Sequence, residues 1–152
     1  MSAPREIRCL SIRQPWAFAI VMGFKPVENR SWRTSYRGPV LIHAGLKEER
    51  DDVEGVLQRI AKQRDLSIET VEVAYRVHID SLGLGSVVGA ALMTDCVTAH
   101  PSPWFYGPYG FVLERAAAFP AIPLRGRQGL FAPPPEVRDH WYVDRWLMRL
   151  AA

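Results

Sequence analysis

The chain has 152 residues, of which 48% are apolar and 23% are charged. A chain of this length buries roughly two-thirds of the surface that its unfolded form exposes, so one compact core and a single domain over residues 1–152 are expected. This composition excludes a disordered or a fibrous protein. The net charge of +3 and the isoelectric point of about 9.1 permit nucleic-acid binding but do not by themselves indicate it.

The cysteines and the N-terminus bear on the cellular compartment. Cys9 and Cys96 match none of the CxxC spacings used for zinc or redox chemistry, so reduced thiols are expected. The stretch from Met1 to Arg8 lacks the apolar core of a signal peptide, and no window approaches the roughly 20 apolar residues of a membrane-spanning helix. We predict a cytoplasmic protein with no membrane association, no metal and no cofactor. The oligomeric state stays open between a monomer and a weak dimer.

The first predicted elements are a short strand over residues 8–11 and a helix over residues 15–22. Proline is favoured at the first position of a helix, because its missing N–H would have no partner there. Gly23 can adopt the left-handed backbone that ends this helix. The chain then alternates as an extended segment, which places Glu28 and Arg30 on one face.

The middle of the chain changes its periodicity twice. Residues 39–44 are almost wholly apolar, which predicts a strand buried on both faces, with His43 as its titratable group. From residue 47 to about 77 apolar residues recur at helical spacing, with Ser67 as the expected N-cap of a second helix. We interpret 47–77 as a helical insertion or lid, followed by a strand over 86–97.

In the last third of the chain, the residue pattern predicts short strands at 110–113, 122–124 and 129–131, and then a closing helix over 136–150. Helices do not separate these strands regularly, which favours the α+β class over a doubly wound sheet. The expected fold is a small mixed β-barrel flanked by helices, with a helical insertion and a C-terminal helix.

Three motifs carry a resemblance to a known family. They are LSIRQPWA at residues 10–17, GFKPVENRSW at residues 23–32 and YRGP at residues 36–39. The strand that ends in IHA, and the stretch from Gly89 to Cys96 ahead of an aromatic loop, continue the pattern. Together they resemble the ASCH domain family of the PUA-like superfamily.

The resemblance implies a PUA-like barrel, a fold associated with recognition of RNA and modified bases. Some ASCH proteins resemble transcription coactivator modules, some have nuclease activity, and one branch hydrolyses the acetyl amide of acetylated cytidine. In that branch a threonine nucleophile follows a lysine by three positions, and a downstream acid assists it. Lys25 matches the lysine, Glu28 stands at the threonine position, and Asp95 is the candidate for the acid.

The residues themselves give Lys25, Glu28 and Arg30 a catalytic and a binding interpretation. As catalytic candidates, Glu28 would be the general base, Lys25 would stabilise an oxyanion or a phosphate, and Arg30 would hold the substrate. Both cations would also lower the pKa of Glu28, which favours an ion pair. As a binding site, the carboxylate would accept hydrogen bonds from the exocyclic amine of cytosine or adenine.

Aromatic and cationic side chains supply further predicted contacts. Aromatic rings offer surfaces for base stacking, and arginines near strand ends offer a rim for phosphates. The predicted nucleic-acid or nucleobase contacts are Arg13, Gln14, Trp16, Arg33, Tyr36, Arg37, Trp104, Tyr106, Arg125 and Arg127. His43 and Asp95 are expected to line the pocket wall. Core packing and scattered solvated charges are the alternatives for these groups.

The leading hypothesis is recognition of RNA or a modified nucleobase by a PUA-like cleft, with RNA or a nucleoside as the partner. One alternative is a hydrolase that acts on an acylated nucleoside or on RNA phosphodiesters. Another is a transcription-coactivator-type interaction module. The sequence leaves open the identity of the ligand and the choice between a polymer and a free nucleoside.

Overall fold

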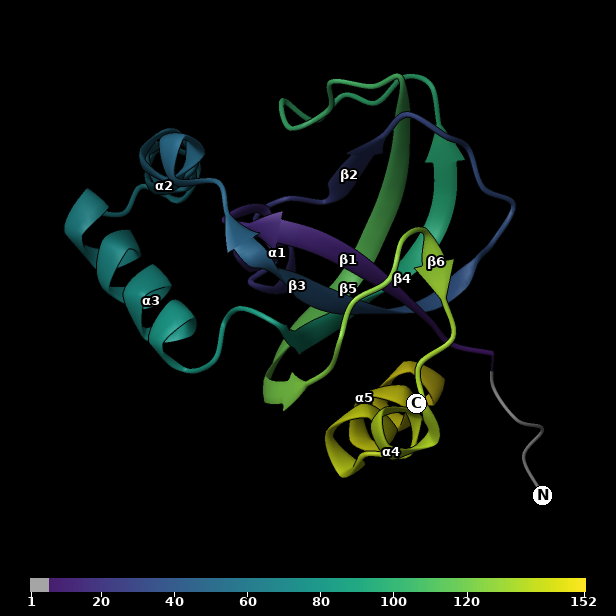
Figure 1. The fold of residues 1–152 in the computed structure, drawn as a ribbon. Coiled ribbons are helices and arrows are strands. Elements are labelled where there is room, and N and C mark those ends of the chain that lie inside the picture. Colours follow the sequence, from purple (N-terminus) through teal and green to yellow (C-terminus); the bar gives the residue numbers. More distant parts are fainter. Residues whose placement is uncertain (1–5) are drawn as a thin grey trace.

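The computed structural model describes residues 6–152, so the first five residues of the predicted single domain lie outside the described part. Its strands form one curled, six-stranded sheet in the order β2-β5-β4-β3-β1-β6, with β1 parallel to β3 and the other neighbours antiparallel (Figure 1). The strands are β1 (Arg8–Gln14), β2 (Val27–Arg30), β3 (Gly38–Glu48), β4 (Ser86–Val97), β5 (Tyr109–Pro123) and β6 (Leu130–Phe131). This half-barrel confirms the predicted α+β class.

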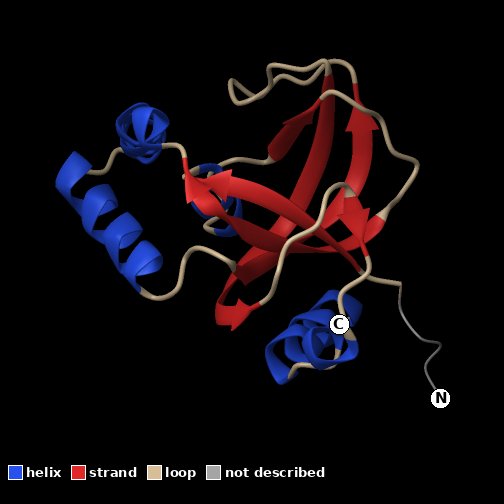
Figure 2. Cartoon of the chain, in the orientation of Figure 1, coloured by secondary structure: helices blue, strands red, loops and turns tan. Residues whose placement is uncertain are grey.

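The helices are α1 (Trp16–Val21), α2 (Arg50–Arg64), α3 (Ile68–Asp80), α4 (Pro135–Arg138) and α5 (Trp141–Ala151). Helices α2 and α3 are inserted between β3 and β4 and stand at one side of the sheet, while α4 and α5 pack at its other end (Figure 2). Within residues 6–152, none of the helices has the length and apolar character needed to cross a membrane.

The first hydrophobic core lies between the sheet and α1. Ile20 and Val21 of α1 pack with Ile42 and other buried sheet residues, and full burial of such a side chain contributes about 1.5–3 kcal/mol. The close approach of α1 to β4 requires Gly89, because a Cβ there would lie 2.6 Å from Cγ1 of Val21 and 2.2 Å from the carbonyl oxygen of Ala117. This packing fixes the start of the segment that leads into β2.

Two further cores attach the remaining helices. Phe18 on the other side of α1 packs with Ile60 of α2 and Tyr75 of α3, which holds the helical insertion against the half-barrel. On the opposite face of the sheet, Val143 and Trp146 of α5 belong to a third core. Each face of the curled sheet is therefore covered by helices along part of its length.

Local signals explain where the helices begin and end. The side-chain oxygen of Gln14 accepts a hydrogen bond from the N–H of Phe18 at 2.9 Å and so caps α1. Gly23 follows α1 with a φ of +82°, as the sequence predicts. The hydroxyl of Ser67 accepts from the N–H of Thr70 at 3.1 Å, which confirms the predicted N-cap of α3.

Several predicted boundaries are wrong, and the helical insertion predicted from residue 47 begins at Arg50 because β3 continues to Glu48. Residues 110–113 and 122–124 are predicted as separate strands, but both belong to β5, whose pairing with β4 contains register shifts that interrupt the alternation. The helix predicted over 136–150 is two helices, α4 and α5. The break occurs because the ring of His140 accepts a hydrogen bond from the N–H of Tyr142 and begins a new helix.

Candidate functional site

Three neighbouring cavities, of about 540, 770 and 800 Å³, lie along the C-terminal half of β1 and together form what we call the groove. The first and second share Ser11 and Arg30, and the second and third share Ser11 and Arg127. The loop 124–129 between β5 and β6 forms one wall, and Figure 1 shows it running in front of β3 and β1. The groove therefore spans the surface between β2 and this loop.

A buried ion-pair cluster closes the β2 end of the groove. Nζ of Lys25 lies 2.9 Å from Oε1 of Glu28 and donates to the carbonyl oxygen of Val27 at 2.6 Å. Nη2 of Arg30 lies 2.9 Å from Oε2 of the same carboxylate and donates to the carbonyl oxygen of Ser11 at 2.9 Å. The structure thus brings together the three residues that the sequence analysis groups on chemical grounds.

The charge state of Glu28 follows from these contacts. Burial alone would raise the pKa of Glu28, but the charges and hydrogen bonds of Lys25 and Arg30 outweigh it and hold the pKa below its ordinary value. Two cations around one ionised carboxylate leave the cluster with a net positive charge. A carboxylate with a lowered pKa is a weak general base, so this geometry favours hydrogen-bond acceptance over proton abstraction.

The rest of the groove is cationic and exposed. It is lined by Arg13, Lys47, Arg125 and Arg127. The side chains of Arg13 and Lys47 are 63% and 71% exposed, and each lies within 4 Å of the carboxylate of Glu49, at 2.5 and 3.9 Å. Exposed pairs of this kind contribute at most about 1 kcal/mol, so an incoming anion can replace Glu49.

Two aromatic side chains border the buried cluster. Trp16 is half-buried at the start of α1, and Nζ of Lys25 lies 5.8 Å from the centroid of its ring. Tyr106 is 62% exposed and lines the same cavity. Its loop is held by Asn29, whose Oδ1 accepts from the N–H groups of Tyr106 and Gly107 at 2.8 and 3.1 Å. An exposed ring on a fixed backbone is suited to stacking on a flat ligand.

His43 lies at the other end of the groove, where it lines the third cavity as the sequence predicts. It is 2% exposed, with Nδ1 3.0 Å from Oγ of Ser11 and Nε2 2.6 Å from the carbonyl oxygen of Leu124. Burial lowers the pKa of His43 against the opposing effect of the Leu124 hydrogen bond, so the imidazole is neutral at neutral pH.

The structure contradicts two of the predicted base contacts. Trp104 is 1% exposed in the second core, and its indole N–H donates to Oε1 of Gln63 at 2.8 Å. Gln14 is fully buried, and its amide donates to the carbonyl oxygen of Gly83 at 2.8 Å. Both side chains make hydrogen bonds inside the protein, because they point inward from the loop and the strand that carry them.

Four more predicted residues lie away from the groove. Asp95 is exposed and pairs with Arg37 at 3.5 Å, so it is not part of a pocket wall. Tyr36 packs against the first core and donates its hydroxyl to the carbonyl oxygen of Pro39 at 2.6 Å. Arg33 is exposed in the same loop, and none of these side chains lines the groove. The loop after β2 carries this part of the family motif to another surface.

Sequence reasoning also missed several residues of the groove. They are Ser11, Asn29, Lys47 and Gln128. Ser11 could have been found, because alternation along β1 puts it on the same face as Arg13. Lys47 was not predicted as a groove residue because the sequence predicts a helix from this position, whereas β3 continues to Glu48.

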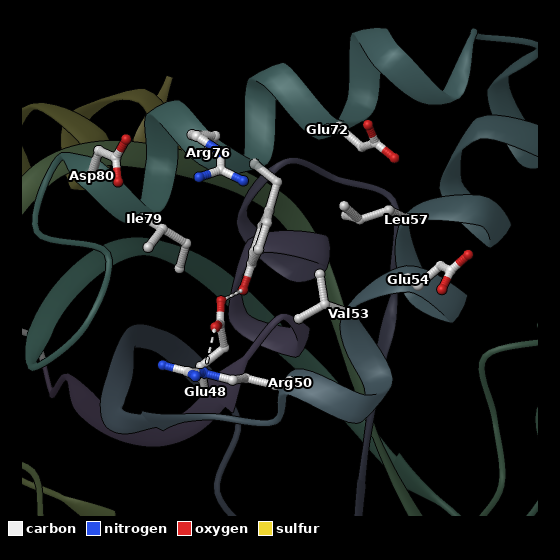
Figure 3. Close-up of a pocket in the computed structure, with 10 residues that line it drawn as sticks. Glu48, Arg50, Val53, Glu54, Leu57, Glu72, Arg76, Ile79 and Asp80 are labelled. Atoms are coloured by element: carbon white, nitrogen blue, oxygen red, sulfur yellow. Dashed lines mark hydrogen bonds and ion pairs between the residues drawn. The ribbon is translucent and has the colours of Figure 1, made fainter.

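A separate cavity of about 580 Å³ lies between α2, α3 and the end of β3 (Figure 3). Figure 3 shows Glu48 pointing toward its floor, where Oε2 accepts the hydroxyl hydrogen of Tyr75. Acidic side chains outnumber basic ones in its lining, with Glu48, Glu54, Glu72 and Asp80 against Arg50 and Arg76, so its charge is opposite in sign to that of the groove. None of the residues predicted to bind or react lies here.

The fold and the groove define a small α+β half-barrel with a basic, aromatic-edged groove. A family-level match to the ASCH domain covers residues 10–98. This match spans more than half of the chain, and the chain therefore belongs to the ASCH domain family, as its motifs predict. The groove residues Ser11, Lys25, Glu28 and Arg30 all lie inside the matched range.

Comparison with known proteins finds relatives by sequence and, separately, by structure. The chain is 36% identical over 90 residues to Activating signal cointegrator 1 from Homo sapiens and from Mus musculus. That alignment covers 59% of this chain but 14% of each relative, so the chain spans about a seventh of the length of these proteins.

Solved structures show the same fold at lower identity. The ASCH protein from Zymomonas mobilis matches with a TM-score of 0.51 at 17% identity, covering 95% of this chain and 94% of that one. A point mutant of the same protein matches with a TM-score of 0.53 at 17% identity, covering 91% of this chain and 97% of that one. These two comparisons support the half-barrel fold and say nothing about individual residues.

Proposed function

We propose that the groove binds single-stranded RNA, with one base held at its β2 end and the phosphates along its open length. The observation that carries this proposal is the composition of the lining. Among the described residues that line the three cavities, six are cations and one is an acid: Arg13, Lys25, Arg30, Lys47, Arg125 and Arg127 against Glu28. Glu49, which pairs with Arg13 and Lys47, lies outside this lining. A lining with an excess of positive charge, edged by aromatic rings, fits a polyanion whose bases stack.

The phosphate contacts are assigned to the exposed cations. Arg13, Lys47, Arg125 and Arg127 lie along the second and third cavities, and Arg13 also reaches the first cavity beside the buried cluster. Cations of this kind neutralise phosphates and release counterions, which gives affinity without sequence preference. Their order along the groove gives the strand a path from β2 toward the loop between β5 and β6.

The base contact is assigned to the β2 end. Glu28 is ionised and 7% exposed, so its carboxylate supplies a fixed hydrogen-bond acceptor for an exocyclic amine. The ring of Tyr106 offers the stacking surface, which contributes about 1–3 kcal/mol for one base. This assignment favours cytosine or adenine, whose amines donate, over uracil.

A coactivator-type interaction is the second candidate. It is supported by the 36% identity over 90 residues to Activating signal cointegrator 1, a protein named as a cointegrator. A protein partner would not require the positive charge of the groove. A binding assay with RNA therefore distinguishes the two candidates. A hydrolase that uses Glu28 as general base has less support, because the carboxylate is paired to two cations.

The proposal is tested by fluorescence anisotropy with a labelled single-stranded RNA of about ten nucleotides. The Arg125→Ala/Arg127→Ala double variant removes two groove cations. Arg33→Ala/Arg37→Ala removes the same charge from exposed arginines outside the groove. We expect the first to weaken affinity by about tenfold, or about 1.4 kcal/mol, and the second to change it by less than about twofold.

Two outcomes would overturn the proposal. One is an absence of RNA binding by the unmodified protein at low salt. The other is an equal loss of affinity in both double variants, since that would reduce the interaction to net charge alone. Tyr106→Ala adds a test of the base contact and should weaken binding without a change in melting temperature, because the side chain is 62% exposed.

A further inference from the structure

Ser11 and His43 form a hydrogen-bonded pair that the proposed RNA binding does not use. They face each other in the parallel register of β1 and β3, and Oγ of Ser11 lies 3.0 Å from Nδ1 of His43. The other ring nitrogen, Nε2, lies 2.6 Å from the carbonyl oxygen of Leu124, which can only accept a hydrogen bond. The proton of the neutral ring is therefore on Nε2, and Nδ1 is the acceptor for the serine hydroxyl.

This arrangement contains the three parts that activate a serine nucleophile. A hydroxyl is within hydrogen-bond reach of a base, and a third group orients that base. Burial keeps the pKa of His43 below its ordinary value, so the ring is neutral at neutral pH and Nδ1 has a lone pair for the hydroxyl hydrogen of Ser11. The orienting group here is the backbone carbonyl of Leu124 in place of a carboxylate.

Ser11 borders the groove, while His43 lies behind it. Ser11 is half-buried and lines all three cavities, whereas His43 is 2% exposed. The chain passes closely over the pair at Gly126, where a Cβ would lie 2.7 Å from Oγ of Ser11 and from Cε1 of His43. Glycine at 126 therefore leaves room for the pair next to the groove wall.

We propose that Ser11 and His43 are a catalytic dyad that hydrolyses carboxylic esters bearing a negative charge. Oγ of Ser11 attacks the ester carbonyl carbon while Nδ1 of His43 takes the hydroxyl proton. The intermediate breaks its C–O bond, and His43 returns that proton to the leaving alkoxide, which leaves an acyl-serine. Water then attacks the acyl-serine with loss of a proton to Nδ1, and this proton passes to Oγ as the carboxylic acid departs.

The charge of the groove sets the substrate class. The guanidinium of Arg30 donates to the carbonyl oxygen of Ser11 at 2.9 Å, so a cation stands beside the residue that carries the nucleophile. Arg13 and Arg127 line the cavities on either side of Ser11 and would hold an anionic substituent of the ester. A cationic ester would be repelled by the same side chains.

This activity goes beyond RNA binding, and its first test uses no RNA, so either proposal can fail alone. The unmodified protein is treated with a fluorophosphonate–rhodamine probe, which reacts with activated serines, and the labelled peptide is identified by mass spectrometry. We expect labelling at Ser11, its loss in Ser11→Ala, and full labelling of Ser35→Ala, which alters an exposed serine outside the groove. No labelling, or labelling that persists in Ser11→Ala, would overturn the proposal.

The second test measures turnover and charge preference. Mono-4-nitrophenyl succinate and 4-nitrophenyl acetate carry the same leaving group and differ by one negative charge. We expect the succinate to be hydrolysed at least about tenfold faster and His43→Gln to lower its rate by about 100-fold or more. Because His43 is buried, a melting curve is measured for each variant to check that it folds. If His43→Gln does not fold, the test rests on the turnover of Ser11→Ala. Equal rates with both esters, or unchanged turnover in Ser11→Ala, would refute the proposed dyad.

Discussion

Replacing Glu28 by glutamine tests the cluster that closes the groove. The change keeps the shape of the side chain but leaves Lys25, 2% exposed, beside Arg30 without the carboxylate that lies 2.9 Å from each. Removing one partner from a buried ion pair costs about 3–5 kcal/mol. At about 2–4 °C per kcal/mol for a domain of this size, the melting temperature should fall by about 6–20 °C at neutral pH.

The pH dependence gives this prediction a second, independent readout. Because the pKa of Glu28 is lowered in the folded state, its stabilisation is present above the ordinary value of 4.5 and is lost as the pH falls through the folded-state pKa. The difference in stability between the unmodified protein and Glu28→Gln should therefore be largest near neutral pH. It should shrink below pH 4.5, where the unfolded chain takes up a proton at Glu28 before the folded protein does.

The assay is urea unfolding followed by tryptophan fluorescence from neutral pH down to about pH 3, within the range where carboxylates titrate. Asp95→Asn is the matched control, because Asp95 is exposed and pairs with Arg37 at 3.5 Å, and it should change stability by less than about 1 kcal/mol. Adding Lys25→Met to Glu28→Gln should recover part of the loss. A loss below about 1 kcal/mol for Glu28→Gln, or one that does not vary with pH, would refute the reasoning.

Three further predictions concern residues outside this cluster. Burial lowers the pKa of His78 to about 4, so stability should fall as the pH drops from 6.5 toward 4, by about 2–3 kcal/mol, and His78→Gln should flatten that slope in acid unfolding curves. Trp104→Ala should cost about 3–5 kcal/mol in urea unfolding, whereas the exposed Tyr106→Ala should cost less than about 0.5 kcal/mol, and equal costs would contradict the assigned burial. Gly126→Ala should cost about 1–3 kcal/mol, since its Cβ would lie 2.7 Å from two side-chain atoms, and an unchanged melting temperature would show that the loop has room to move.

The buried cluster could be predicted because its geometry is local. Glu28 and Arg30 are two positions apart on a strand, and side chains at that spacing share a face. Lys25 is three positions before Glu28, across the short turn that follows α1. The same locality explains why the N-cap of α3 and the glycine that ends α1 were found from the sequence.

The errors arise where distant partners decide how a side chain is placed. Trp104 and Tyr106 belong to one aromatic loop, yet the first is buried and the second is exposed. Their placement is set by Gln63, 41 positions from Trp104, and by Asn29, 77 positions from Tyr106. Pattern and composition do not reveal such pairs, so the sequence predicts the loop as functional without separating its two rings.

The Ser11–His43 pair was missed for a related reason. Alternation along β1 places Ser11 on a face, but only the parallel register of β1 with β3 brings His43 opposite to it. The carbonyl oxygen of Leu124, which fixes the ring, comes from a loop 81 positions after His43. A serine and a histidine without a recognisable motif gave no sequence signal of a dyad.

The central claim is that the exposed groove cations bind RNA phosphates, and the salt dependence of RNA affinity tests it most directly. Anisotropy titrations from about 50 to 300 mM salt should give log Kd rising linearly with log salt. If Arg13, Lys47, Arg125 and Arg127 each neutralise one phosphate, the slope should be about 3 for a single strand. It should fall to about 1.4 in Arg125→Ala/Arg127→Ala. A slope near zero, or one unchanged by that double variant, would contradict the account.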